Sequence, residues 1–232
     1  EPFFNYSHII GDTNVFTNKA VYIGAYQGSI IGEKVVSKTN IVPSSNLLDP
    51  SILRRMCSNN GYNYFMIDYT TLNAIRWLYL IEYGNFDCQN SIGLGVVTGS
   101  SFNKNGDCDE LYNSGTLSGS DTRKANNLAS VIYRGIENMW GNRWQILDGV
   151  NIVNNSTTEK NIYIGKDPYL YDYNNNSNYI WPYKTLYKGS TYGYFNSIND
   201  SRYTIPLIES SNALIKDNFL IKFNLIEYNP IY

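Results

Sequence analysis

The feature of this sequence that most constrains its fold is the block from Tyr133 to Asn151, which combines tryptophan, glycine and charges of both signs. Glycine readily adopts a positive φ and lets two backbone segments approach closely. Trp140 and Trp144 supply rings large enough to anchor a turn on a core. The block therefore predicts a rigid structural nucleus. Its glycines are Gly135, Gly141 and Gly149.

The block resembles a pattern of the C-type-lectin-like fold, Arg-Gly-x-Glu-Asn-x-Trp-Gly-Asn-x-Trp followed by Asp-Gly. It is similar to the formylglycine-generating-enzyme branch of that fold and, more closely, to its version in bacteriophage and prophage structural proteins. Residues 21–26 and 74–84 fit the same family. The positions that match the pattern are Arg134, Gly135, Glu137, Asn138, Trp140, Gly141, Asn142, Trp144, Asp148 and Gly149.

The resemblance implies an α+β domain in which two helices pack on a small twisted antiparallel sheet with long surface loops. We expect a single domain over residues 20–232, preceded by an arm or linker at residues 1–20. Members of the family usually continue to a Gly-Gly-x-Trp strand and a closing Gly-x-Arg segment, and neither follows Ile205-Pro206. The C-terminal segment is therefore expected to diverge from about residue 207 onward.

Two helices are predicted independently from capping signals. The first begins with Asp49 as N-cap, ahead of a proline, and stops near residues 60–61. The second runs from a cap at Asp68 or Thr70 to Gly84. Its apolar face should pack on a sheet. The residues on that face are Leu72, Ile75, Leu78 and Tyr79.

The rest of the chain divides into predicted strands and loops. Alternating side chains predict strands at residues 21–26, 161–165 and 213–228. Residues 98–127 carry few apolar side chains, which predicts a long surface excursion. Residues 167–194 are rich in tyrosine and asparagine and are predicted to be a loop region.

Composition excludes several classes of function. With a formal net charge of −2 the chain lacks the clustered Lys and Arg of a nucleic-acid-binding surface. No apolar run reaches the roughly 18 residues of a membrane helix, and the N-terminal residues lack a signal-peptide pattern, so we expect a soluble chain without membrane insertion. Cys57, Cys88 and Cys108 suit neither a disulfide scaffold nor a zinc site, and reduced thiols are expected, with one disulfide left open.

Catalytic chemistry has few candidates in this sequence. The only histidine is His8, in the polar N-terminal arm. The last cysteine is Cys108, so the paired cysteines of formylglycine-generating enzymes near the chain end are absent. Glu137 and Asp148 could form the carboxylate pair of a glycosidase. The structural interpretation is an ion pair between Glu137 and Arg134, with Asp148 in a turn. We expect no enzyme activity and no cofactor.

One segment superficially resembles a calcium loop. Its oxygen-bearing side chains alternate at Asn103, Asn105, Asp107 and Asp109. The twelve-residue pattern is incomplete, and the calcium motifs of sugar-binding lectins do not occur. We therefore expect no metal.

The remaining signal is aromatic. The chain has 22 tyrosines, which either form recognition surfaces or reflect AT-rich coding. Rings in the loop-rich segment after residue 167 could stack on sugars or form protein hot spots, or could instead fill the core or a subunit interface. The proposed ligand-binding residues are Tyr169, Tyr171, Tyr173, Tyr179, Trp181, Tyr183 and Tyr192.

These observations predict a non-catalytic binding domain associated with a phage tail, which recognises a glycan or protein on the host cell surface. The alternatives are a structural virion component that connects subunits and a hydrolase of cell-wall glycan. Expected partners are the host receptor, other tail proteins and further copies of the chain, since tail appendages are commonly oligomeric. The expected location is the virion, assembled in the cytoplasm of the bacterial host.

Overall fold

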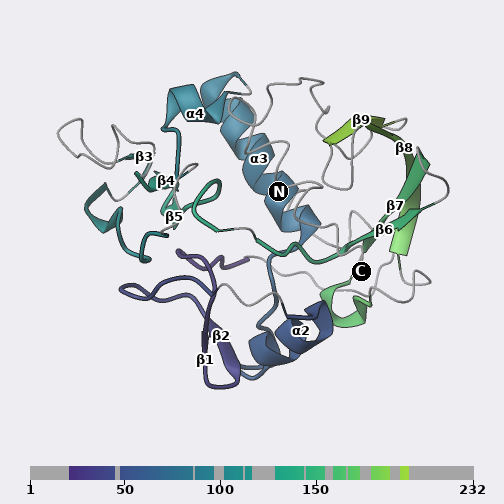
Figure 1. Ribbon diagram of the computed structural model, residues 1–232, viewed down its shortest axis with the longest axis horizontal. Helices are drawn as coiled ribbons and strands as arrows, with labels where there is room; N and C mark the ends of the chain where they lie inside the picture. The colour runs from purple at the N-terminus through teal and green to yellow at the C-terminus, as the bar shows by residue number, and fades with distance from the viewer. Residues whose placement is uncertain are drawn as a thin grey trace.

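The computed structural model shows a mixed α/β arrangement (Figure 1). It describes residues 21–44, 48–85, 87–96, 102–111, 113–116, 129–143, 145–154, 159–165, 167–172, 179–188 and 194–198. Within these ranges there are three α-helices and three small antiparallel sheets. The predicted arm at residues 1–20, the strand at residues 213–228 and the divergent segment after residue 207 lie outside the described residues.

The helices are α2 (Pro50–Ser58), α3 (Tyr69–Tyr83) and the short α4 (Cys88–Ser91). The side chain of Asp49 accepts a hydrogen bond from the Ser51 amide at 2.8 Å, which confirms the predicted cap of α2. Asp68 accepts from the Thr71 amide at 2.7 Å, so Asp68 and not Thr70 begins α3. None of the helices in the described part of the chain combines the length and the apolar run needed to cross a bilayer.

Each sheet pairs strands that follow one another in sequence, and all pairings are antiparallel. The first sheet contains β1 (Ser29–Ile31) and β2 (Lys34–Val36). The second contains β3 (Gly115–Thr116), β4 (Val131–Tyr133) and β5 (Ile136–Glu137). The third contains β6 (Val150–Asn154), β7 (Glu159–Gly165), β8 (Tyr179–Lys188) and β9 (Tyr194–Ile198). Two 3₁₀ turns, η2 (Asp109–Leu111) and η3 (Pro168–Leu170), complete the structure as described.

The hydrophobic core is built around α3, which Figure 1 shows in the middle of the molecule. Leu72, Ile75 and Tyr79 are buried on one face of this helix, as predicted, whereas Leu78 is half-buried. They belong to the same cluster as Tyr133 of β4. Each fully buried side chain of this size stabilises the fold by about 1.5–3 kcal/mol relative to an exposed one.

The strand predicted at residues 21–26 is wrong, and the surface excursion predicted at residues 98–127 is wrong in part. Residues 21–26 do not form a strand, because the Ala25 carbonyl accepts from the Glu137 amide at 2.7 Å and the Tyr26 amide donates to Ser37 Oγ at 2.9 Å. These single contacts replace a regular ladder. Within the predicted surface excursion at residues 98–127, Asn105 and Cys108 are buried.

The predicted loop at residues 167–194 is also wrong in part, because β8 occupies residues 179–188 and β9 begins at residue 194. Pro182 lies within β8 although proline lacks an N–H for the ladder. The register of β7 and β8 shifts here: Ile162 pairs with Tyr183, and the next pair is Ile164 with Ile180. This β-bulge accommodates the proline inside the sheet.

Cys57, Cys88 and Cys108 are buried and none of them forms a disulfide, in agreement with the prediction of reduced thiols. Burial raises the pKa of the Cys57 thiol to about 11, and the Asp148 carboxylate adds to the increase. A thiol with this pKa stays protonated at neutral pH and is a poor nucleophile.

Candidate binding surface

The tryptophan and glycine block forms a series of left-handed turns. All three of its glycines have positive φ, as predicted: Gly135 (78°), Gly141 (76°) and Gly149 (70°). Arg134, Asn138 and Asn142 also have positive φ, which is uncommon outside glycine. Gly141 has a second constraint, since a Cβ there would lie 2.7 Å from the backbone nitrogen of Val96.

Trp140 anchors the block in the core. It is 1% exposed, and its Nε1 donates a hydrogen bond to the Gly93 carbonyl at 2.9 Å. A buried indole whose N–H is satisfied contributes both packing and orientation. The predicted role of Trp140 is therefore confirmed, while Trp144 lies outside the described residues.

The predicted ion pair between Arg134 and Glu137 is wrong. Arg134 instead binds Glu82 on α3, with its Nε 2.9 Å from Oε2. The Glu137 carboxylate points into the interior and accepts hydrogen bonds from the amides of Gly106 at 3.2 Å and Cys108 at 2.9 Å. The positive φ at Arg134 and Asn138 reverses the chain on both sides of β5, which separates the two side chains.

Burial raises the pKa of the Glu137 carboxyl to about 7. The Cys108 and Gly106 amides oppose this increase, and the nearby carboxylates of Asp107 and Asp109 add to it. Glu137 therefore holds the segment at residues 106–108 against β5 rather than facing solvent.

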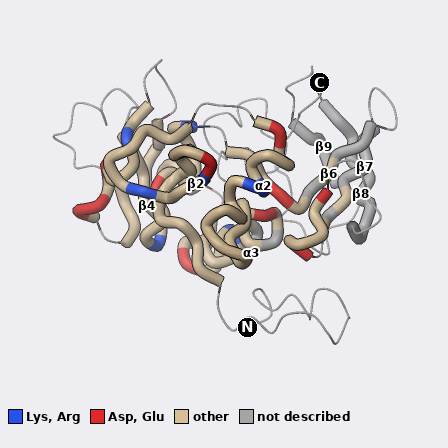
Figure 2. Tube along the Cα trace, turned by 90° about the horizontal axis from the view of Figure 1, so that it is seen from below, with Lys and Arg blue, Asp and Glu red and all other residues tan. Residues whose placement is uncertain are grey.

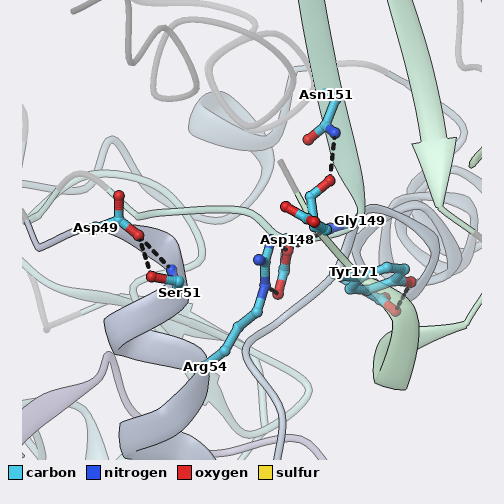
Figure 3. A network of polar contacts seen from close by, with 9 residues as sticks. Asp49, Ser51, Arg54, Asp148, Gly149, Asn151 and Tyr171 are labelled. Atoms are coloured by element: carbon cyan, nitrogen blue, oxygen red, sulfur yellow. Dashed lines mark hydrogen bonds and ion pairs between the residues drawn. The ribbon is translucent and has the colours of Figure 1, made fainter. Parts of the chain in front are cut away.

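Asp148 makes a paired contact with α2, which Figure 3 shows from close by. Arg54 Nε and Nη2 donate to its two carboxylate oxygens at 2.7 and 2.6 Å. The Asp148 amide also donates to the Ile67 carbonyl, and its own carbonyl accepts from the Tyr69 amide, each at 2.9 Å. Both candidate glycosidase carboxylates are thus buried and bound to other parts of the fold.

The candidate calcium residues make hydrogen bonds within the fold. Asn103 Nδ2 donates to Asp107 Oδ2 at 3.1 Å, whereas Asn105 Nδ2 donates to two backbone carbonyls. Asp109 accepts from the Tyr26 hydroxyl at 2.6 Å and from Thr39 Oγ1 at 3.1 Å. In the part of the chain that the structure describes, no group of three or more His, Cys, Asp and Glu side chains is placed to hold a metal ion.

Tyr171 does not belong to a surface, contrary to the prediction. It is 8% exposed, and its hydroxyl donates to Asp68 Oδ2 at 2.9 Å. Its ring packs so closely on Gly149 that a Cβ there would lie 2.8 Å from it. Figure 3 shows Tyr171 beside the Asp148-Gly149 turn, where it fixes the chain that follows η3.

Tyr169, only two residues earlier, lies in an exposed aromatic cluster. Its ring stacks on Tyr62 with 4.8 Å between centroids and 25° between planes. It also meets Phe65 edge-on, at 4.8 Å and 86°. The Tyr169 hydroxyl donates to Asn63 Oδ1 at 2.6 Å, and Tyr64 packs on Gly61 close by. The name Tyr62–Tyr169 cluster is used below for Tyr62, Asn63, Tyr64, Phe65 and Tyr169.

Most of the cluster is exposed, although a ring stack, an edge-on ring contact and a hydrogen bond order it. Tyr62 is 75% exposed, Tyr64 59% and Phe65 41%. Large aromatic side chains grouped on a surface are typical of binding sites. The sequence prediction found Tyr169 but missed residues 62–65, where the signal was three aromatics directly after the predicted end of α2.

The tryptophan and glycine block contacts the backbone or side chains of residues close in sequence to both parts of this cluster. Asp148 bonds the backbone at residues 67 and 69, which follow shortly after residues 62–65. Gly149 packs against Tyr171, two residues after Tyr169. The two halves are therefore brought together by the same turn.

The two described segments that carry the cluster contain few charged side chains. Residues 59–67 contain none, and residues 167–172 contain only Asp167 and Asp172. Figure 2 shows that charges of both signs are scattered along the described trace instead of collecting in one region.

The other proposed ligand-binding residues cannot be added to the cluster. Tyr179, Trp181 and Tyr183 contribute backbone to β8. Tyr173 and Tyr192 lie outside the described residues. Comparisons with protein-family models, with curated proteins and with solved structures found no match to this chain.

Proposed function

We propose that this chain is a non-catalytic binding domain of a bacteriophage or prophage tail-associated protein, and that it recognises a glycan or protein on the host cell surface. The observation that carries the proposal is the exposed Tyr62–Tyr169 cluster. Rings held in a fixed arrangement offer contact area at a low cost in conformational entropy. The fold assigned to the domain under this proposal is C-type-lectin-like.

Two features support that fold: the order of helices and strands along the chain, and the turns of the tryptophan and glycine block. Two capped helices precede a half that is richer in strands, and the turns of the block have the positive φ values that its glycines predict. Tail appendages commonly assemble from several copies, so the proposal includes oligomerisation, other tail proteins as partners and a location in the virion.

Support for binding rather than catalysis comes from the two candidate carboxylates. Glu137 is 2% exposed and Asp148 is 3% exposed. A glycosidase pair must reach a scissile bond from both sides of a cleft. Side chains that are buried and committed to backbone amides or to an arginine are better suited to holding the fold.

The direct experiment is binding of the fluorescently labelled, purified chain to a panel of low-GC bacterial cells. Saturable binding to particular strains is the expected result. A folded sample that binds no strain would refute host recognition. Treating the cells with protease or with periodate, which cleaves vicinal diols, then separates a protein receptor from a glycan.

The alternative, a structural connector between virion subunits, is favoured by one observation. Trp77 and Ile81 are one helical turn apart on α3 and are 37% and 73% exposed. An apolar pair on a core helix is typical of a subunit contact. If this face joins copies, Ile81→Glu should lower the mass measured by light scattering in solution while leaving helix content unchanged. An unchanged mass would argue against the connector role.

A further inference from the structure

The Tyr62–Tyr169 cluster presents one ring more fully than the others. Tyr62 covers one face of Tyr169 and Phe65 meets it edge-on. Tyr169 is therefore a supporting ring, whereas Tyr62 remains 75% exposed. The face of Tyr62 opposite Tyr169 is a flat apolar platform.

The Asn63 side-chain amide lies next to the platform and can donate hydrogen bonds to a ligand. Asn63 is exposed, and its Oδ1 accepts the Tyr169 hydroxyl at 2.6 Å. The amide group of asparagine has two further N–H donors. An apolar platform flanked by hydrogen-bond donors matches a sugar ring, which has a face of C–H groups and a rim of hydroxyls.

The charges near the platform favour one class of glycan. Recognition of phosphate or carboxylate requires Arg or Lys in contact with the ligand. The two described segments that form the cluster, residues 59–67 and 167–172, contain no Lys or Arg, and their exposed or partly exposed charges are the carboxylates Asp167 and Asp172. These carboxylates would repel an anionic polymer.

The exposed area of the cluster favours a glycan over a protein ligand. A stable protein interface buries roughly 800 Å² on each partner. Four partly exposed aromatic rings offer on the order of 400–500 Å², which fits one or two sugar units.

We infer that the Tyr62–Tyr169 cluster binds a neutral glycan, with a pyranose ring stacked on the outer face of Tyr62 and a hydroxyl bonded by the Asn63 amide. This inference rests on the proposed function and specifies its ligand. The stacked and hydrogen-bonded rings hold the platform in place before the ligand arrives, which lowers the cost of ordering it.

The first test uses the full chain and defined polymers. The probes are dextran and a neutral galactan, compared with polygalacturonate and poly(glycerol phosphate) of similar mass, in titrations followed by saturation-transfer NMR. Binding to a neutral polymer should be unchanged between about 0.05 and 0.5 M salt, because no charges are paired. Binding only to the anionic polymers, or to none of the four, would overturn the inference.

Variants locate the contact. Tyr62→Ala should weaken binding of the neutral polymer roughly tenfold, and Asn63→Ala should weaken it by less. Tyr22→Ala is the matched control, because Tyr22 is 95% exposed and lies elsewhere on the chain. Equal loss in the Tyr62 and Tyr22 variants, or no loss in the Tyr62 variant, would overturn the assignment.

The second test separates this inference from host recognition. Surface polysaccharide from a strain that binds the chain is divided by anion exchange into neutral and anionic fractions. Competition by the neutral fraction supports the inference. Competition only by the anionic fraction, or loss of cell binding after protease, would overturn the neutral-glycan assignment while leaving host recognition in place.

Discussion

At the scale of single residues, the block acts through backbone geometry and buried polar contacts. Glu137 shows this most clearly, because its carboxylate holds the amides of Gly106 and Cys108 in a part of the fold where charge is costly. The sequence indicated that Glu137 belonged to a structural motif. It could not indicate the partner, since the residues that Glu137 binds lie about 30 positions away and the positive φ at Arg134 and Asn138 sets its direction.

The raised pKa of Glu137 makes a prediction about pH. A carboxyl with a higher pKa in the folded chain than in the unfolded one binds its proton more tightly when folded, so its contribution to stability is complete below pH 4.5 and is lost as pH rises to about 7. The free energy of unfolding should fall across this range by about 3 kcal/mol.

Urea unfolding at several pH values between 4.5 and 8 measures this effect. Glu137→Gln should show a flatter profile than the natural chain, because glutamine does not titrate. Parallel profiles for the two proteins would show that Glu137 is not the group responsible.

Gly141 makes a prediction about backbone strain. Gly141→Ala should destabilise the fold by about 2–4 kcal/mol, because it adds the cost of a left-handed alanine to a Cβ only 2.7 Å from the Val96 nitrogen. Gly32→Ala is the matched control: its φ is +59° and a Cβ there would have no neighbour within 4 Å. Its cost should be about 1 kcal/mol. Similar melting temperatures for both variants would contradict this account of Gly141.

At the scale of secondary-structure elements, the sequence predicted what depends on local chemistry. Asp49 and Asp68 are both caps because a carboxylate ahead of a helix satisfies an amide that the helix leaves unpaired. The strand at residues 161–165 also lies within β7. The predictions failed where distant contacts decide the structure, as in the segment at residues 21–26 that bonds to β5, and at Pro182, which a bulge accommodates.

The two caps should differ in strength. Asp68→Ala should cost about 2–4 kcal/mol of unfolding free energy, because it removes the cap of α3 and leaves the buried Tyr171 hydroxyl without that acceptor. Asp49→Ala should cost about 1 kcal/mol, since the contact between Asp49 and Ser51 is exposed. Chemical denaturation of both variants checks the difference, and a larger loss for Asp49→Ala would contradict it.

At the scale of the whole molecule, the predicted mixture of helices and antiparallel strands is confirmed. The prediction of one sheet is not. The described residues form three separate sheets. The number of sheets depends on which strands meet in space, and strand patterns alone do not encode this. The C-type-lectin-like assignment remains a proposal.

The sequence predicted only part of the binding surface, because its two halves are distant in the chain and meet only in the fold. Tyr169 was identified from the density of aromatic residues, and the neighbouring Tyr171 proved to be buried against Asp68. The other half of the surface, at residues 62–65, is about 100 positions earlier in the chain. The stack of Tyr62 on Tyr169 depends on the fold around the Asp148-Gly149 turn, which the sequence pattern does not show.

The central claim is that the Tyr62–Tyr169 cluster attaches this chain to host cells. The most direct measurement is the apparent Kd of labelled protein on a bacterial strain that it binds, for the natural chain, for Tyr62→Ala combined with Tyr169→Ala, and for Tyr22→Ala. We predict that the double variant loses at least tenfold in affinity while circular dichroism shows that it remains folded, and that Tyr22→Ala binds like the natural chain. Undiminished binding by a folded double variant would contradict the claim.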